Sequence, residues 1–242
     1  DTGVRYSTFM TSITKLMETA SDHKVPVMIL DRPNPIRANT FDGPIPRPEY
    51  QSFEAYHLVP IRHGLTIGEY AILVNENGWV RELKRVDLHI IPMANYKRNM
   101  SFGDTKLPWI NPTPFLKDVE STLMYAGMDL FRGTNINVGF GTDKPYLRFG
   151  SPWLSNRYLK EQLDNLNMPG VSFKLLKYKP MGHEGKKKVP QYDQSFCSGI
   201  EIQITDPATC NPIIVGTSIL LLIERIHPRE FQWIGNGYVD KL

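Results

Sequence analysis

The sequence predicts a mixed α/β chain whose first lobe contains a parallel sheet and whose second lobe is α+β. In the first lobe, Phe9, Ile13 and Met17 recur at helical spacing, and a continuously apolar stretch follows at residues 25–30. A strand that is apolar on both faces is typical of a parallel sheet covered by helices. Near the other end, residues 198–204 alternate apolar and polar side chains, which indicates an antiparallel strand with one buried face.

The pattern of predicted helices and strands changes near Pro152. We therefore expect a first lobe over residues 1–150 and a smaller second lobe over residues 151–242. The periodicity predicts further helices at residues 6–23, 67–78, 118–126, 155–166 and 213–226, and further strands at residues 86–93 and 171–178.

Composition excludes several classes of function. The 242 residues carry 28 Lys and Arg against 25 Asp and Glu, a net charge of +3, which is too small to indicate a nucleic-acid partner. The longest apolar run, residues 213–223, is shorter than a membrane span of about 20 residues. The six histidines have no metal-ligand spacing, so we expect no metal and no cofactor. Cys197 and Cys210 can pair or remain reduced, and the basic run at residues 186–188 indicates a solvated loop.

Residues 61–71 hold the densest group of chemically useful side chains. Thr66 followed by Glu69 predicts a capping box and a helix that begins at Ile67. Arg62 and His63 then lie in the entering loop, where their side chains can converge on a ligand. Capping alone also explains the Thr-x-x-Glu pair, so both interpretations stay open.

A second candidate group follows the predicted strand at residues 25–30. Asp31, Arg32 and Asn34 emerge at its carboxyl end, which is where open α/β sheets bind their ligands. The alternative is a network that holds the loop in place, with Asp31 pairing with Arg32 or capping a turn.

The loop expected at residues 95–109 contains Arg98 and Trp109, which suit the recognition of a carboxylate and the stacking of a sugar ring. Trp109 can equally be a core anchor. The glycine-rich residues 133–143 lack the third glycine of a dinucleotide fingerprint and the lysine of a P-loop, which disfavours a nucleotide-dependent enzyme.

Six short blocks occur together in one order over roughly residues 1–153: Asp1-x-Gly3-x-Arg5-Tyr6, Asp31-Arg32-Pro33-Asn34-Pro35, residues 60–69, Leu107-Pro108-Trp109, Gly133-Thr134-Asn135 and Gly150-x-Pro152-Trp153. In this order they resemble the bacterial exo-β-N-acetylmuramidases of peptidoglycan turnover. The resemblance implies a Rossmann-like parallel-sheet lobe joined to a smaller lobe. It also implies a glycosidase that releases terminal N-acetylmuramic acid from the non-reducing end of peptidoglycan fragments, in the bacterial periplasm or outside the cell.

The chemistry implied by the resemblance selects candidate residues. Glycoside hydrolysis normally needs two carboxyl groups, and Glu69 and Asp31 are the best candidates in this chain. The lactyl carboxylate of the substrate calls for arginines, which bind carboxylates through paired hydrogen bonds. The candidate substrate-binding residues are Arg5, Arg32, Asn34, Arg62, His63, Arg98, Trp109 and Asn135.

The chain also departs from the family pattern. Relatives carry an upstream Glu-His-Gly stretch with the expected catalytic glutamate, and this chain begins after it, so we expect a lobe that is incomplete at its N-terminus and is completed by an N-terminal segment or chain. Where relatives have a Glu-Gly-Thr-Asn block, this chain has Arg132 before Gly133, and the loop that follows lacks a further carboxylate and an arginine. These differences motivate an alternative function, a non-catalytic module that binds a saccharide or another partner.

Overall fold

The computed structural model describes residues 1–182 and 189–234, which form two compact units. One unit spans Asp1–Pro108, and the other contains the described residues from Trp109 onward. This boundary precedes the predicted one after residue 150, because the strand Arg148–Ser151 pairs within the second unit. With the boundary at this position, the C-terminal unit is the longer in sequence and not the smaller lobe that the sequence predicts.

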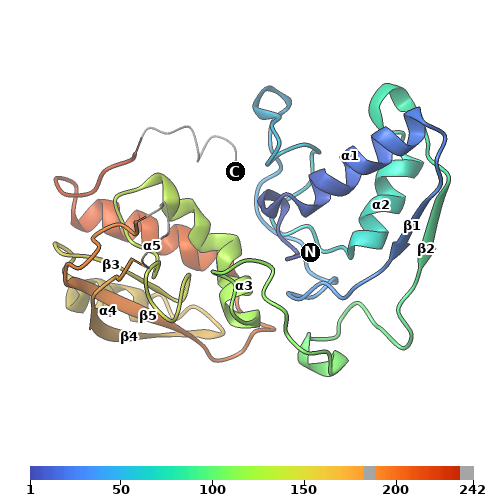
Figure 1. Cartoon of the computed structure of the whole chain (residues 1–242). Coiled ribbons are helices and arrows are strands. Elements are labelled where there is room, and N and C mark those ends of the chain that lie inside the picture. Colours follow the sequence, from blue (N-terminus) through green and yellow to red (C-terminus); the bar gives the residue numbers. More distant parts are fainter. Residues whose placement is uncertain (183–188, 235–242) are drawn as a thin grey trace. The chain divides into compact units, whose positions relative to one another are not determined.

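The first unit contains two helix–strand pairs, α1 (Phe9–Asp22) with β1 (Val27–Leu30) and α2 (Ile67–Glu76) with β2 (Leu88–Ile91) (Figure 1). The two strands pair in parallel, with Val27 opposite Leu88 and Leu30 opposite Ile91. The predicted αβ unit and parallel sheet are confirmed. Short 3-10 helices lie at Arg5–Ser7, Pro48–Tyr50, Arg81–Leu83 and Gly103–Thr105.

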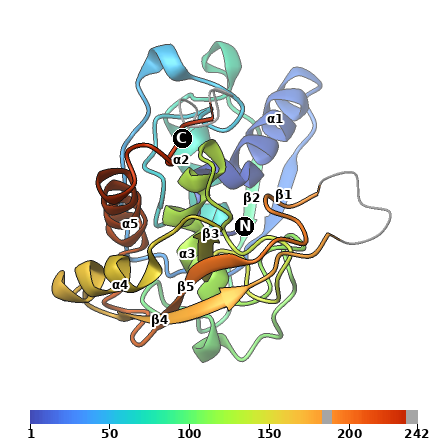
Figure 2. The ribbon, with the colours of Figure 1, turned by 90° about the vertical axis from the view of Figure 1, so that its left-hand side faces the viewer.

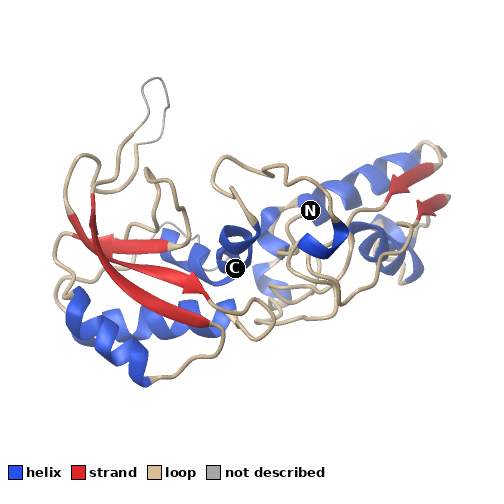
Figure 3. Cartoon of the chain, turned by 90° about the horizontal axis from the view of Figure 1, so that it is seen from below, coloured by secondary structure: helices blue, strands red, loops and turns tan. Residues whose placement is uncertain are grey.

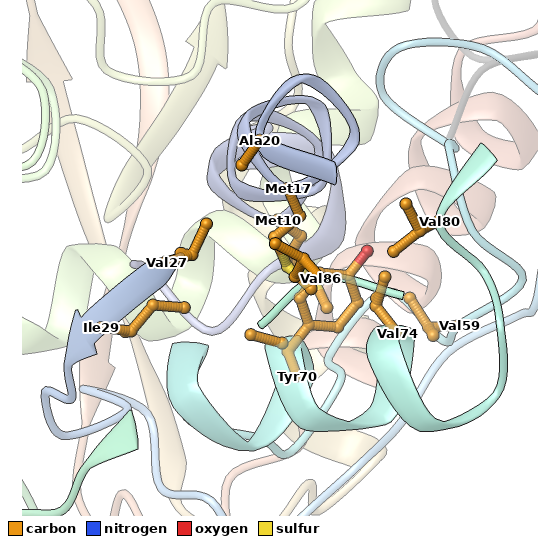
Figure 4. Close-up of a cluster of buried hydrophobic side chains, with 11 residues drawn as sticks. Met10, Met17, Ala20, Val27, Ile29, Val59, Tyr70, Val74, Val80 and Val86 are labelled. Carbon is orange, nitrogen blue, oxygen red and sulfur yellow. The ribbon is translucent and has the colours of Figure 1, made fainter. Parts of the chain in front are cut away.

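Both helices of the first unit pack on one face of its sheet. Figure 4 shows Met17 of α1, Val27 and Ile29 of β1, and Tyr70 of α2 in one buried cluster. Successive residues of a strand point to opposite faces. Met28 therefore faces away from this cluster and is 65% exposed, and Leu30 is 68% exposed. The expectation of a strand buried on both faces is wrong for the described residues, because α1 and α2 cover a single face.

An imidazole also joins the edge of this cluster. The ring of His57 stacks on Trp79, with centroids 5.2 Å apart and planes 25° from parallel, and it lies 6.0 Å from the ring of Tyr70. Burial lowers the pKa of His57 to about 4. The neutral imidazole therefore acts as a packing group at neutral pH.

The second unit is α+β, as the sequence predicts. Its sheet has the order β3-β5-β4, formed by β3 (Arg148–Ser151), β5 (Cys197–Ile204) and β4 (Val171–Tyr178), with both pairings antiparallel (Figure 2). The helices are α3 (Val119–Met128), α4 (Asn156–Asn165) and α5 (Pro212–Ile226), with a 3-10 helix at Asp129–Gly133. Figure 3 shows the curved sheet with helices alongside it. The periodicity does not predict β3, because this strand is only four residues long.

Helices α3 and α5 approach each other through glycine. A Cβ atom on Gly127 would lie 1.8 Å from the carbonyl oxygen of Pro212, and one on Gly216 would lie 2.4 Å from the carbonyl oxygen of Gly127. Neither position has room for a side chain, so the two backbones come into direct contact. This contact explains why α5, predicted as a buried helix, carries a glycine in its apolar stretch.

Three further expectations concern thiols, membranes and metals. Cys197 and Cys210 are buried and no disulfide joins them, so the pairing left open by the sequence does not occur. Within the described parts of the chain, no helix has the length and apolarity to cross a bilayer. Those same residues contain no cluster of three potential metal ligands. The basic run at residues 186–188 lies outside the described residues.

We predict that His57 makes the first unit less stable in mild acid. Its pKa is about 4 in the folded protein against about 6.5 when unfolded, so the unfolded chain binds the proton first and stability falls as the pH drops from 6.5 toward 4. This one group changes the free energy of unfolding by less than about 1.4 kcal/mol per pH unit. His57→Phe keeps a ring against Trp79 and removes the titration. Chemical denaturation at several pH values should show a shallower pH dependence for this variant, and an unchanged slope would contradict the assignment.

Candidate functional site

The N-terminus of α2 is held by a capping box, as the sequence predicts. The backbone N–H of Glu69 donates to the Thr66 hydroxyl over 3.2 Å, and the backbone N–H of Thr66 donates to Glu69 Oε2 over 2.9 Å. Two N–H groups that have no partner within the helix are thereby satisfied. Thr66 is 1% exposed, so this cap is part of the packed interior.

Asp31 extends the cap from the end of β1. The Thr66 hydroxyl donates to Asp31 Oδ2 over 2.7 Å, and the backbone N–H groups of Gly68 and Arg32 each donate to Asp31 Oδ1 over 2.9 Å. A Cβ atom on Gly68 would lie 2.7 Å from the Asp31 carboxyl carbon. Glycine at position 68 therefore lets the carboxylate reach the first turn of the helix, where negative charge is favourable.

Arg98 closes the site on the other side of Glu69. Its guanidinium pairs with Glu69 Oε1 and donates to the carbonyl oxygens of Ala38 and Gly64, the latter over 2.8 Å. The side chain is still 48% exposed. Arg98 thus joins three segments that are distant in sequence while keeping part of its surface available to a ligand.

The residues that follow β1 form a loop-locking network. The Asn34 side chain donates to the carbonyl oxygen of Leu65 over 2.9 Å and accepts from the N–H of Ile36 over 3.0 Å. Arg62 is 4% exposed and donates to the carbonyl oxygen of Ile36. This geometry matches the structural alternative that the sequence leaves open for residues 31–35.

His63 is buried beside these contacts. Its Nδ1 accepts from the N–H of Leu65 over 3.2 Å, so the proton of the neutral ring is on Nε2, which lies 3.0 Å from Asp1 Oδ2. Burial lowers the pKa of His63 to about 3. At neutral pH His63 is therefore an uncharged group that holds the loop at fixed orientation.

The remaining candidates differ in exposure and in location. Arg5 is buried, with its backbone N–H donating to the carbonyl oxygen of Ile61, whereas the side chain of Arg32 is exposed. Trp109 and Asn135 belong to the second unit. The Trp109 indole donates to the carbonyl oxygen of Leu116 over 3.3 Å. The Asn135 side chain donates to the carbonyl oxygen of Glu230 and accepts from the N–H of Gln232.

Tyr96 is a member of the site that the sequence reasoning missed. Burial raises the pKa of Tyr96, and the Glu69 and Asp31 carboxylates raise it further. A neutral phenol that can donate a hydrogen bond thus lies near both candidate carboxylates. The signal available in the sequence is its position two residues before Arg98, in the same loop.

We predict that Thr66→Val lowers the unfolding free energy of the first unit by about 2 kcal/mol, because the helix loses its cap and Asp31 loses a hydroxyl donor. Thr66→Ser keeps the hydroxyl and should lose less than about 1 kcal/mol, mainly through the removed methyl group. Denaturant unfolding of both variants measures the difference. Equal losses would show that packing, and not the hydroxyl, holds the site.

Comparisons with known proteins cover the whole chain. The N-terminal model of the family "Exo-beta-N-acetylmuramidase NamZ" matches residues 1–120, and the C-terminal model of that family matches residues 123–242. The peptidoglycan beta-N-acetylmuramidase NamZ of Bacillus subtilis (strain 168) is 36% identical over 244 residues, an alignment that covers 100% of this chain and 56% of that protein. The chain therefore spans little more than half the length of this curated relative.

Two crystal structures of DUF1343 family proteins from Bacteroides fragilis NCTC 9343 have similar folds. One matches 94% of this chain and 57% of its own chain, with a TM-score of 0.87 and 25% identity. The other matches 99% of this chain and 59% of its own, with a TM-score of 0.70 and 26% identity. The two family models follow each other along this sequence without overlap. The chain accordingly belongs to the exo-β-N-acetylmuramidase NamZ family.

Proposed function

We propose that the protein containing this chain is a glycoside hydrolase that releases terminal N-acetylmuramic acid from the non-reducing end of peptidoglycan fragments. The observation that carries the proposal is the 36% identity, over the whole chain, to a relative named as a peptidoglycan beta-N-acetylmuramidase. Because this chain covers 56% of that relative, the activity is proposed for the full-length protein.

In this proposal the site at the start of α2 faces the substrate through its exposed groups. Arg98 and Arg32 are the accessible cations for the lactyl carboxylate, and Glu69 and Asp31 are the candidate carboxyl groups near the scissile bond.

The other predicted binding residues fall into two groups. Arg5, Asn34, Arg62 and His63 are buried, so they would act by holding the loops in position. Trp109 and Asn135 belong to the second unit, and the partly buried indole of Trp109 suits a sugar face. These roles follow from burial and hydrogen bonding together with the family resemblance.

A second candidate function is a non-catalytic module that binds peptidoglycan saccharides. It is favoured by the way the two carboxylates are used, since Asp31 accepts three hydrogen bonds and Glu69 bonds to Thr66 and Arg98. A carboxyl group that is held as a helix cap is poorly placed to transfer a proton to a leaving oxygen. The fold and a binding surface would persist in such a module without turnover.

We predict that the full-length protein releases N-acetylmuramic acid from an N-acetylmuramyl-N-acetylglucosamine disaccharide. Chromatography of the products measures the release, and a substrate with the two sugars in the opposite order is the control for action at the non-reducing end. If the folded protein binds the disaccharide in calorimetry and releases nothing, the binding module is the correct function. Without binding or release, both candidates fail.

We predict that Glu69→Gln separates capping from catalysis. A glutamine oxygen can still accept the Thr66 N–H, so the helix cap persists, but the amide cannot serve as acid, base or nucleophile. If Glu69 is a catalytic residue, kcat should fall by about a hundredfold or more at nearly unchanged thermal stability. Glu69→Ala is the matched control, since it removes both roles and should also lower stability. Near-normal turnover by Glu69→Gln would assign Glu69 to the cap alone.

A further inference from the structure

Strand β4 forms one edge of the sheet in the second unit. The order β3-β5-β4 gives β4 a single neighbour, and among the described residues no isolated bridge joins it on its other side (Figure 2). The edge is eight residues long, as long as the central strand β5. A long edge of this kind is a template on which another extended chain can pair.

The backbone groups of β4 that point away from β5 can be identified from neighbouring hydrogen bonds. In an antiparallel pair, residues that lie opposite each other alternately bond to each other and point outward. The N–H of Thr205 donates to the carbonyl oxygen of Gly170, one step beyond the register pair of Val171 with Ile204. No hydrogen bond joins the outward groups to another described segment. The residues whose N–H and C=O groups point outward are Val171, Phe173, Leu175 and Lys177.

A pocket lies at the carboxyl end of this edge, with a cavity volume of about 550 Å³. β4 contributes Leu175 and Lys177 to its wall, and the first turn of α4 contributes Asn156 and Arg157. Phe196, which precedes β5, also lines it. The Phe196 side chain is 60% exposed and that of Leu175 is 38% exposed, so the pocket offers apolar surface to a ligand.

The start of α4 is tied to the sheet beside this pocket. The Asn156 side chain donates to the carbonyl oxygens of Leu176 and Gly199, over 3.3 and 2.9 Å. The N-cap residue Ser155 makes no side-chain hydrogen bond to the helix. The positive end of the α4 dipole therefore lies at the pocket without a side-chain cap.

Every charged side chain that lines the pocket among the described residues is a cation. Arg157 and Lys177 are exposed, and neither side chain makes an ion pair or a hydrogen bond in the described part of the chain. Lys177 Nζ lies 4.6 Å from the centre of the Phe196 ring, and Lys179 Nζ lies 5.7 Å from it. A cation over a ring keeps N–H groups for an anion, so the pocket favours a carboxylate.

The other face of β4 is positive as well. Successive residues of a strand point to opposite faces, and Lys174 is exposed on the face that Lys177 does not share. Lys174 lies opposite Glu201 of β5, whose carboxylate already bonds to Lys144 and Arg148 over 2.7 and 2.8 Å. Lysines on an edge strand repel a basic partner, so this edge selects for acidic ones.

We propose that β4 is a docking strand for an extended, acidic segment of a partner protein. The segment adds to the sheet as a further strand, its backbone bonds to the outward groups of β4, and a carboxylate side chain enters the pocket beside Arg157 and Lys177. A second copy of this chain is a poorer occupant, because it brings the lysines of two β4 strands to one edge. A neutral strand leaves these cations without counter-charges.

The charge requirement is tested by fluorescence anisotropy with the full-length protein and labelled peptides of the length of β4. The acidic probe alternates glutamate and valine, and the neutral probe has glutamine in place of each glutamate. We expect the acidic probe to bind at least about tenfold more tightly. Lys177→Glu and Arg157→Glu should each weaken its binding about tenfold, the effect of one charge-assisted hydrogen bond. Lys24→Glu, which reverses an exposed lysine of the first unit, is the matched control and should leave binding unchanged.

Backbone pairing is tested separately from charge with N-methylated forms of the acidic probe. Methyl groups on two consecutive central residues place one methyl toward β4 in either strand direction, so binding should fall at least about tenfold. In the control peptide the same two methyl groups are on residues separated by one position. One edge of that peptide keeps all its N–H groups, so binding should persist.

Equal binding of the acidic and neutral probes, or equal binding of the two methylated peptides, would overturn the proposal. Absence of binding by the acidic probe, or unaltered binding by both pocket variants with unchanged thermal unfolding, would do the same. Self-association of the full-length protein that Lys177→Glu alters would make a second copy the occupant and exclude the acidic partner. None of the probes contains a sugar, so each result is independent of the proposed hydrolase activity.

Discussion

The hydroxyl of Thr66 is the contact on which the candidate site of the first unit depends. It donates to Asp31 at the end of β1 and accepts from the N–H of Glu69 in the first turn of α2. A hydroxyl can donate one hydrogen bond and accept two, so a single buried side chain joins a strand end to a helix start. The loop before α2 is then tied to the loop after β1 by the hydrogen bond from the Asn34 side chain to the carbonyl oxygen of Leu65, within the first unit.

This arrangement places structural and chemical demands on the same two carboxylates. A negative group at a helix N-terminus is stabilised by the helix dipole and by the unpaired N–H groups there. Asp31 and Glu69 therefore have a sufficient structural reason to be present, whatever their role in hydrolysis. Their surroundings still include Arg98, whose side chain is 48% exposed, so a substrate-facing role for the cluster and a capping role for its carboxylates are compatible.

Buried polar side chains also hold loops in place in the second unit. Asn137 and Asp129 are buried polar side chains whose hydrogen bonds go to backbone groups and to a tyrosine. Buried polar groups must be hydrogen-bonded, so these contacts fix the surrounding loops in one arrangement.

The sequence by itself determined the features that depend on neighbouring residues. The helices α1, α2 and α5 and the capping box of Thr66 follow from periodicity and from side chains three residues apart. Tertiary structure alone decided which groups meet across long stretches of chain. Examples are the contacts of Asp31 with Gly68, 37 residues away, and of Arg98 with Gly64, 34 residues away. β3 and the position of the boundary between the units were likewise decided by pairing with β5. Local patterns carry no information on such contacts, because the free energy that selects them comes from burying polar and apolar groups together in the folded chain.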